Sequence, residues 1–121
     1  MKVAVSAQGN DLDALVDPRF GRARWFIFAD TGTEEWSAHD NSANVGANGG
    51  AGVQAGTTVA EQGVEAVITG NVGPNAHKVL AAAGIAIYQA GNGVSVRDAL
   101  AALARGQLAK ADAPTVSGHW A

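Results

Sequence analysis

Residues 64–76 read Val-Glu-Ala-Val-Ile-Thr-Gly-Asn-Val-Gly-Pro-Asn-Ala, and this stretch contains a complete strand–loop–helix unit. Its apolar, β-branched run predicts a buried strand over Val64–Thr69. Gly70–Asn75 forms the following loop, and Pro74 suits the first turn of a helix, where proline loses no needed N–H bond. In an α/β protein, ligands bind in the crevice beyond such strand ends. The stretch therefore predicts an α/β fold with a ligand site among its loops.

The rest of the chain alternates between short apolar runs bounded by turn signals and amphipathic stretches that end at glycine. The predicted strands cover residues 2–7, 25–29, 34–40, 64–69 and 85–89, and the predicted helices cover residues 51–62, 74–83 and 96–104. Ser95 is the expected cap of the last helix. This order predicts a mixed five-stranded sheet, edged by a hairpin, with helices on both faces. We expect one domain over residues 1–108 and a C-terminal tail over residues 109–121, in which Trp120 is the only large apolar group.

The composition limits the classes of function. With 121 residues, 47% hydrophobic content and 16% charged content, the chain suits one globular domain. A net charge of −3 argues against general nucleic-acid binding, which needs a basic excess. Zero cysteines exclude disulfides, thiol catalysis and thiolate ligands. The start lacks the apolar core of a signal peptide, and no apolar run approaches the ~20 residues of a membrane span, so we expect a cytoplasmic protein.

Two loops carry groups that suit an anion. The first, residues 8–24, contains Arg19 and Arg22, which are three residues apart and can face the same side of a turn. The second, Gly70–Asn75, opens a helix whose N-terminus carries a partial positive charge and unpaired N–H groups. It matches neither a Walker loop nor a dinucleotide fingerprint. The alternatives are a tight strand-to-helix connection for the second loop and a surface ion pair between Arg22 and Asp17.

The side chains of these loops give the candidate site. Phe20 either walls a pocket beside the arginines or plugs the core, and His77 is either an additional donor and soft-metal contact or an exposed helix histidine. His39 is expected to point outward from the edge strand, and His119 has no predicted place. The candidate cofactor-binding residues are Asn10, Arg19, Phe20, Arg22, Gly70, Asn71, Gly73, Asn75 and His77.

Catalytic chemistry finds no support in the sequence. A two-metal nuclease needs several carboxylates gathered at strand ends. Here Asp11, Asp13, Asp17 and Asp30 are spread over loops and turns, and the run Val3–Val5 bears no acid. Nucleophilic catalysis needs a serine or threonine with an activating base, and no such arrangement is indicated. We therefore predict a protein without catalytic residues.

Several motifs, taken in order, are similar to those of a known family. They are Met1-Lys2-Val3-Ala4-Val5, Asp17-Pro18-Arg19-Phe20-Gly21-Arg22-Ala23, the loop Asn41–Gly52, Gly70-Asn71-Val72-Gly73-Pro74-Asn75-Ala76 and Ala82-Ala83-Gly84-Ile85. Through them the chain resembles the nitrogenase iron–molybdenum cofactor biosynthesis (dinitrogenase cofactor-binding) family over residues 1–108. The resemblance implies a ribonuclease-H-like fold without nuclease chemistry, in a family that binds, carries or helps to insert metal–sulfur clusters.

A stretch near the start of the chain resembles particular members of this family. Residues Ser6–Leu12 are similar to those of members that hold a sulfide-bridged molybdenum–copper trianion without covalent attachment. The resemblance thus implies a non-enzymatic carrier, in an anaerobe, of a molybdenum–copper sulfide cluster or a related molybdenum or iron–sulfur cluster. We expect the cluster to bind in a cleft formed by loops 8–24, 41–50 and 70–75. We also expect a protein partner in cluster delivery or complex assembly. A small phosphate- or nucleotide-binding regulatory domain and a protein-interaction module are the alternatives.

Overall fold

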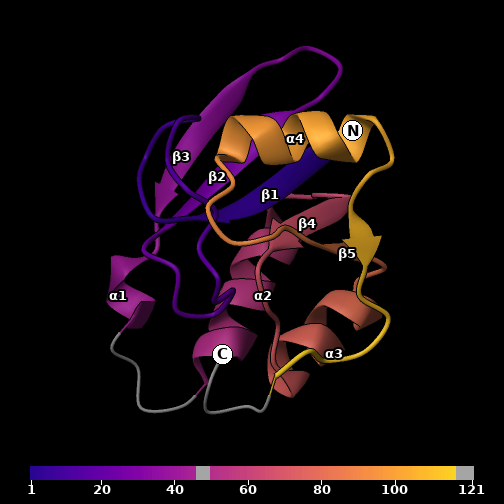
Figure 1. Cartoon of the computed structure of the whole chain (residues 1–121). Coiled ribbons are helices and arrows are strands. Elements are labelled where there is room, and N and C mark those ends of the chain that lie inside the picture. Colours follow the sequence, from indigo (N-terminus) through magenta and orange to yellow (C-terminus); the bar gives the residue numbers. More distant parts are fainter. Residues whose placement is uncertain (46–49, 117–121) are drawn as a thin grey trace.

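The computed structural model describes residues 1–45 and 50–116, and β1 (Lys2–Ala7) lies in the interior of its sheet (Figure 1). Residues 3–5 of this strand are fully buried, in agreement with their apolar character. β1 pairs antiparallel with β2 (Trp25–Asp30), and β2 pairs antiparallel with β3 (Trp36–Asp40). This half of the sheet is the predicted hairpin edge, and all five residues of β3 are exposed.

The other half of the sheet contains strands parallel to β1. β4 (Ala66–Thr69) pairs with β1, and β5 (Ala86–Gln89) pairs with β4. A sixth strand, β6 (Ala109–Lys110), pairs antiparallel with β5 and completes the order β3-β2-β1-β4-β5-β6. The predicted count of five strands is therefore wrong, because the sheet has six strands within the described residues.

The additional strand lies in the segment that the sequence predicts to be a tail. The two residues of β6 oppose Tyr88 and Gln89, and the N–H of Ala111 donates to the carbonyl oxygen of Ile87 at 2.8 Å. Two residues are too few to show the apolar–polar alternation by which strands are found in a sequence. The first part of this segment is therefore joined to the sheet, whereas the predictions for His119 and Trp120 lie outside the described residues.

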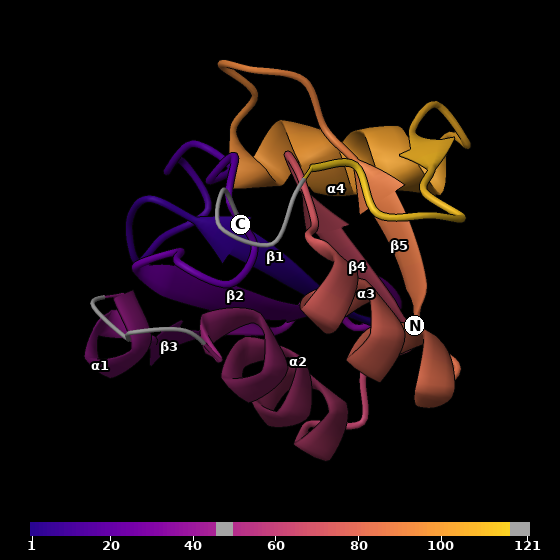
Figure 2. The same cartoon turned by 90° about the horizontal axis from the view of Figure 1, so that it is seen from below.

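Helices cover both faces of the sheet, as predicted, and Figure 2 shows the resulting three layers. α2 (Ala51–Glu61) and α3 (Pro74–Ala82) lie on one face, and α4 (Val96–Ala104) lies on the other. Ser95 caps α4 as expected, since its side chain accepts a hydrogen bond from the N–H of Asp98 at 3.1 Å.

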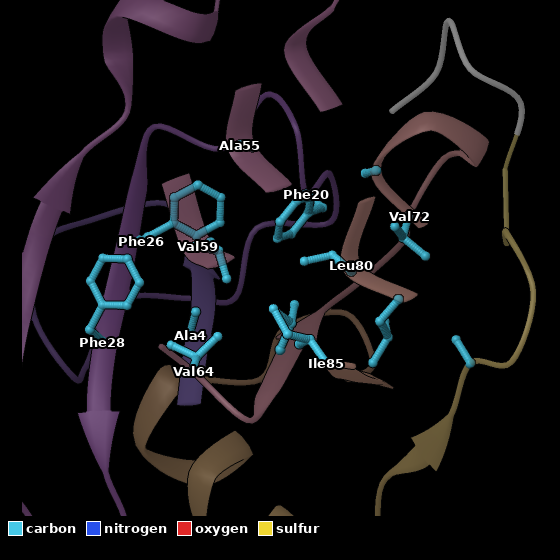
Figure 3. Close-up of a cluster of buried hydrophobic side chains, with 14 residues drawn as sticks. Ala4, Phe20, Phe26, Phe28, Ala55, Val59, Val64, Val72, Leu80 and Ile85 are labelled. Atoms are coloured by element: carbon cyan, nitrogen blue, oxygen red, sulfur yellow. The ribbon is translucent and has the colours of Figure 1, made fainter. Parts of the chain in front are cut away.

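The larger apolar cluster lies between the sheet and the α2–α3 pair (Figure 3). Ala55 and Val59 from α2, Leu80 from α3 and Phe26 from β2 have essentially no exposed surface. A second cluster lies beneath α4, where Val96 is fully buried. Ala55 of α2 and Ala76 of α3 are buried members of the first cluster.

The segment 41–50, predicted as a glycine-rich loop, begins with a short helix, α1 (Ser42–Val45). Residues 46–49 of the predicted loop lie outside the described residues. Within residues 1–45 and 50–116, no helix has the length and apolar character that crossing a membrane would require.

Candidate functional site

Four strands end at the same edge of the sheet. β2 is antiparallel to both β1 and β3, so β1 and β3 run in one direction, which β4 and β5 share. The segments that follow their carboxyl ends are residues 8–24, 41–45, 70–73 and 90–95, which we call the loop edge. In Figures 1 and 2 the loop after β1 lies beside α1 at this edge. Ligand sites of α/β proteins form at such an edge.

The arginine loop (residues 17–22) and the 70–73 loop are in direct contact. Arg19 pairs with Asn71 in a parallel bridge, and the N–H of Phe20 donates to the carbonyl oxygen of Asn71 at 3.1 Å. A Cβ atom added to Gly70 would lie 2.5 Å from Cα of Pro18, so only glycine allows this approach. The two predicted anion-binding loops therefore form one structural unit.

Buried hydroxyl groups hold that unit to the sheet. Oγ of Ser6, at the end of β1, lies 2.9 Å from the carbonyl oxygen of Asp17 and 2.7 Å from Oγ1 of Thr69. The side-chain amide of Gln89 donates to the carbonyl oxygen of Gly70 at 3.1 Å. These contacts join β1 to the arginine loop and to β4, and they join β5 to the loop that follows β4, so they hold the loop backbone against the sheet.

Asp17 is the acidic side chain of this unit, with only 9% of its surface exposed. Its carboxylate accepts a hydrogen bond from the backbone N–H of Arg19 at 2.8 Å. Burial raises the pKa of Asp17 above its ordinary value, and the Arg19 hydrogen bond and charge only partly oppose that rise. The sequence leaves open a surface ion pair between Asp17 and Arg22. In the structure the Asp17 carboxylate is buried and interacts with Arg19 instead.

Arg22 and two asparagines join the arginine loop to the segment after β3. Nη1 of Arg22 donates to the carbonyl oxygen of Val45 at 3.0 Å, at the end of α1. Nδ2 of Asn44 lies 3.1 Å from the carbonyl oxygen of Gly21 and 2.7 Å from that of Ala51. Nδ2 of Asn41 donates to the carbonyl oxygen of Ala23 at 2.8 Å. Because Asn44 binds both Gly21 and Ala51, it connects the arginine loop to the first residue of α2.

The starts of α2 and α3 add backbone N–H groups to the loop edge. α2 follows Gly50, which has a left-handed conformation with φ 75°, and α3 follows Gly73. Neither start has a hydrogen-bonded side-chain cap. A Cβ atom at Gly52 would lie 3.2 Å from the backbone nitrogen of Ala76, so the first turns of the two helices are neighbours. Two adjacent helix starts combine their partial positive charges, which favours an anion.

The structure distributes the predicted site residues over three environments. Arg19 and Asn75 are exposed, and Arg22 is partly buried. Phe20 has 0% exposure and its ring centroid lies 5.2 Å from that of Phe26, so of its two predicted roles the structure shows the core one. The candidates that the structure brings together at the contact of the two loops are Arg19, Gly70 and Asn71. Arg22 contacts Val45 at the end of α1, and Gly73 and Asn75 lie at the start of α3.

The other two candidates, Asn10 and His77, lie in segments outside the arginine loop and the 70–73 loop. Asn10 is exposed in the loop after β1, where its neighbour Leu12 accepts a bond from the N–H of Arg97. His77, one turn into α3, is partly buried and lines a hollow of about 220 Å³ with Lys110 and Asp112. His39 is exposed on β3, as predicted, with its ring 6.0 Å from that of Phe28. Among the described residues, no three histidine, aspartate or glutamate side chains are grouped in a way that could hold a metal ion.

Residues 1–106 match the protein family described as dinitrogenase iron-molybdenum cofactor. The chain belongs to this family. The matched range contains the arginine loop, the segment after β3, the 70–73 loop and both neighbouring helix starts. Membership of the dinitrogenase cofactor family indicates a cofactor-binding or carrier protein rather than an enzyme.

Two solved structures and one further protein are similar to this chain over nearly its whole length. The apo form of the orange protein from Desulfovibrio gigas is 41% identical to this chain, with a TM-score of 0.91 over 95% of this chain and 96% of that one. A putative NifB protein from Thermotoga is 34% identical, with a TM-score of 0.84 over 97% and 98% of the two chains. An uncharacterized protein from Methanocaldococcus jannaschii is 31% identical over 112 residues, which are 91% of each chain. The phosphate- or nucleotide-binding alternative finds no support in these relatives.

In this member of the dinitrogenase cofactor family, Asn41 and Asn44 are not among the candidate site residues that the sequence predicts, although the expected cleft includes their segment, 41–50. Their partners, Ala23 and Gly21, are 18 and 23 residues away along the chain, so no local pattern reveals the hydrogen bonds. The available signal is the asparagine-rich composition of the 41–50 segment, because asparagine amides often fix loop backbone.

Proposed function

We propose that this protein is a non-enzymatic carrier of an anionic, molybdenum-containing sulfide cluster, either molybdenum–copper sulfide or a related molybdenum or iron–sulfur cluster. The cluster binds non-covalently at the loop edge. The observation that carries the proposal is the direct contact between the arginine loop and the 70–73 loop, beside two neighbouring helix starts that lack side-chain caps. Family membership supplies the class of ligand.

The chemistry of the loop edge suits such a ligand. The exposed guanidinium of Arg19 supplies a charge that can reach an anion, and the amide of Asn75 supplies neutral donors. Arg22 donates one N–H to the carbonyl oxygen of Val45, so its guanidinium adds positive charge and also joins the arginine loop to the end of α1. The chain has no cysteine, and a sulfide cluster brings its own sulfur ligands. Phe20 is fully buried, and its part as an apolar wall stays a prediction, as do Asn10 and His77 as further donors.

The energies are compatible with a carrier that must release its cargo. A hydrogen bond to a charged group contributes about 1.5–3 kcal/mol, so four or five contribute roughly 6–15 kcal/mol before costs. Association itself costs an estimated 4–15 kcal/mol, roughly the same amount. The net affinity is therefore moderate, which suits delivery to a recipient protein better than permanent capture.

Two further proposals accompany this one. The order β3-β2-β1-β4-β5, with β2 antiparallel to its neighbours, supports a ribonuclease-H-like topology. A cytoplasmic location and a recipient protein for the cluster follow from the carrier role and stay predictions.

The proposal is tested by titrating tetrathiomolybdate with copper into the purified protein. We expect a coloured charge-transfer band that stays with the protein through gel filtration. The Arg19→Gln variant should bind about tenfold more weakly, because a hydrogen bond to a charged group contributes about 1.5–3 kcal/mol and 1.4 kcal/mol is tenfold. Arg105→Gln is the matched control, since Arg105 is an exposed arginine at the end of α4, away from the loop edge.

Unchanged spectra of the gel-filtered protein would contradict the carrier function. Equal affinities of the two arginine variants would contradict the assignment of Arg19. A thermal shift produced by nucleotides but not by thiometalates would favour a phosphate-binding regulator instead.

A further inference from the structure

The C-terminal segment returns to the loop edge after β6. The backbone N–H of Val72 donates to Oγ1 of Thr115 at 2.9 Å, and the N–H of Thr115 donates to the carbonyl oxygen of Val72 at 2.9 Å. The Thr115 hydroxyl also lies 3.3 Å from that carbonyl oxygen. We call this reciprocal pair the Thr115–Val72 clasp. It joins residues that are 43 positions apart.

The clasp acts on the centre of the 70–73 loop. Val72 lies between Asn71, whose carbonyl accepts the N–H of Phe20, and Gly73, which precedes the first turn of α3. The Val72 side chain is fully buried (Figure 3), so the clasp binds the backbone of a residue that the core already anchors. Both backbone polar groups of Val72 are thus committed to Thr115.

The segment that carries Thr115 is itself fixed to the sheet. Ala111 is buried, and its N–H donates to the carbonyl oxygen of Ile87 in β5. The segment therefore connects the outer edge of the sheet with the loop edge. It also lies beyond residue 106, where the match to the family ends, so family membership does not assign it a role.

We propose that Thr115 is a positioning residue that holds the 70–73 loop in its binding conformation and slows release of the cluster. This inference rests on the proposed carrier function. A glycine-rich loop has many accessible conformations. If a ligand binds only one of them, its apparent affinity is reduced by the fraction of molecules that have that conformation. The clasp removes that loss by fixing Val72, which orients the backbone on both sides of it.

The test measures two quantities on the full chain. Exchange of the Val72 amide hydrogen reports on the clasp, and the release rate of a bound molybdenum–copper sulfide cluster, followed by its charge-transfer band, reports on binding. Thr115→Val keeps the shape of the side chain and removes the hydroxyl. Thr115→Ser restores the hydroxyl. Thr57→Val is the matched control, because Oγ1 of Thr57 donates to a backbone carbonyl on the exposed side of α2 at 2.8 Å.

We expect Thr115→Val to accelerate both Val72 amide exchange and cluster release by about three- to tenfold, the effect of one hydrogen bond. Thr115→Ser and Thr57→Val should both stay within about twofold of the unsubstituted protein, which is smaller than the effect of one hydrogen bond. Loading the unsubstituted protein with cluster should further slow exchange at Val72, a readout that needs no variant.

Three outcomes would overturn the inference. One is release at the normal rate from Thr115→Val although its Val72 amide exchanges faster. Another is equally fast release from Thr57→Val, and the third is Val72 exchange that cluster loading leaves unchanged. If the unsubstituted protein binds no cluster, the carrier function fails, and the inference fails with it.

Discussion

Asp17 places a carboxylate next to the charge that is proposed to bind an anion. Its side chain accepts the N–H of Arg19, and its carbonyl oxygen lies near the N–H of Gly70 at 3.3 Å and Oγ of Ser6. The backbone of Asp17 thus organises the two loops, whereas burial of its side chain raises the pKa of the carboxyl. Ionisation of this carboxyl is therefore less favourable in the folded chain than in the unfolded chain.

Replacing Asp17 with asparagine tests this balance through the pH dependence of stability. Because the folded pKa is raised, the stabilising contribution of Asp17 is complete below the unfolded pKa of about 3.9 and is lost as the pH rises through the folded pKa. The amide of the Asp17→Asn variant does not titrate, and its oxygen can still accept the N–H of Arg19. The free energy of unfolding of Asp17→Asn, relative to the unsubstituted protein, should therefore rise with pH over that interval.

Urea unfolding of both proteins between about pH 3 and 7, a range that spans the unfolded pKa, measures this difference, and the contributions of groups they share cancel. A relative stability that falls with rising pH would show that the hydrogen bond and the charge of Arg19 outweigh burial.

Individual residues of the site differ in how far the sequence predicts them. Arg19 and Arg22 stand out because guanidinium groups in a glycine-containing turn are few in an acidic chain. Phe20 is ambiguous in the sequence, since burial depends on its neighbours, and the structure places it in the core. Asn44 escapes prediction because both of its carbonyl partners come from other segments. Local chemistry is visible in the sequence, and long-range hydrogen bonds are not.

At the scale of elements, the predicted helices and the five longer strands are present because each has a local signal. Ser95 and the apolar spacing that follows it define α4, and Pro74 defines the start of α3. β6 has no such signal, since two residues paired to the end of β5 carry no periodicity. Gly70, in the β4–α3 connection, is required by a contact that only the structure shows. The backbone that approaches it belongs to the arginine loop, which is distant in the sequence.

Gly70→Ala tests the contact between those two elements. Its new Cβ would lie 2.5 Å from Cα of Pro18 and 3.0 Å from the carbonyl oxygen of Pro18, so the arginine loop must move away. We expect a loss of about 1–3 kcal/mol in the free energy of unfolding, the usual cost of overpacking. Cluster affinity should fall as well, because Arg19 moves with the loop.

Gly91→Ala is the matched control, since Gly91 also lies in a loop after a strand and has no atom within 4 Å of the added Cβ. Its stability should change by no more than about 0.5 kcal/mol. Equal denaturant midpoints for the two variants would mean that the close approach at Pro18 is not required.

For the whole molecule, the direction of the strands decides where function is concentrated. Four strands end at the loop edge, whereas the β2–β3 turn lies at the opposite edge because β2 is antiparallel to both of its neighbours. The alternation of strands and helices in the sequence is enough to predict a mixed sheet with two covered faces. It does not show that the segments after β1, β3 and β4 share hydrogen bonds, because that depends on strand order.

Backbone amide exchange with and without bound cluster tests this location over the whole molecule. Binding at the loop edge should slow exchange in residues 19–23 and 71–76, whose backbone lies at the contact of the two loops and the start of α3. Residues 31–35 lie in the β2–β3 turn and should exchange at unchanged rates. Gly84, which precedes β5 at that same far edge, provides a second reference position. Protection concentrated in residues 31–35, or spread evenly over both edges, would contradict binding at the loop edge. Protection limited to residues 71–76, with residues 19–23 unaffected, would assign the anion to the start of α3 alone and would remove the arginine loop from the site.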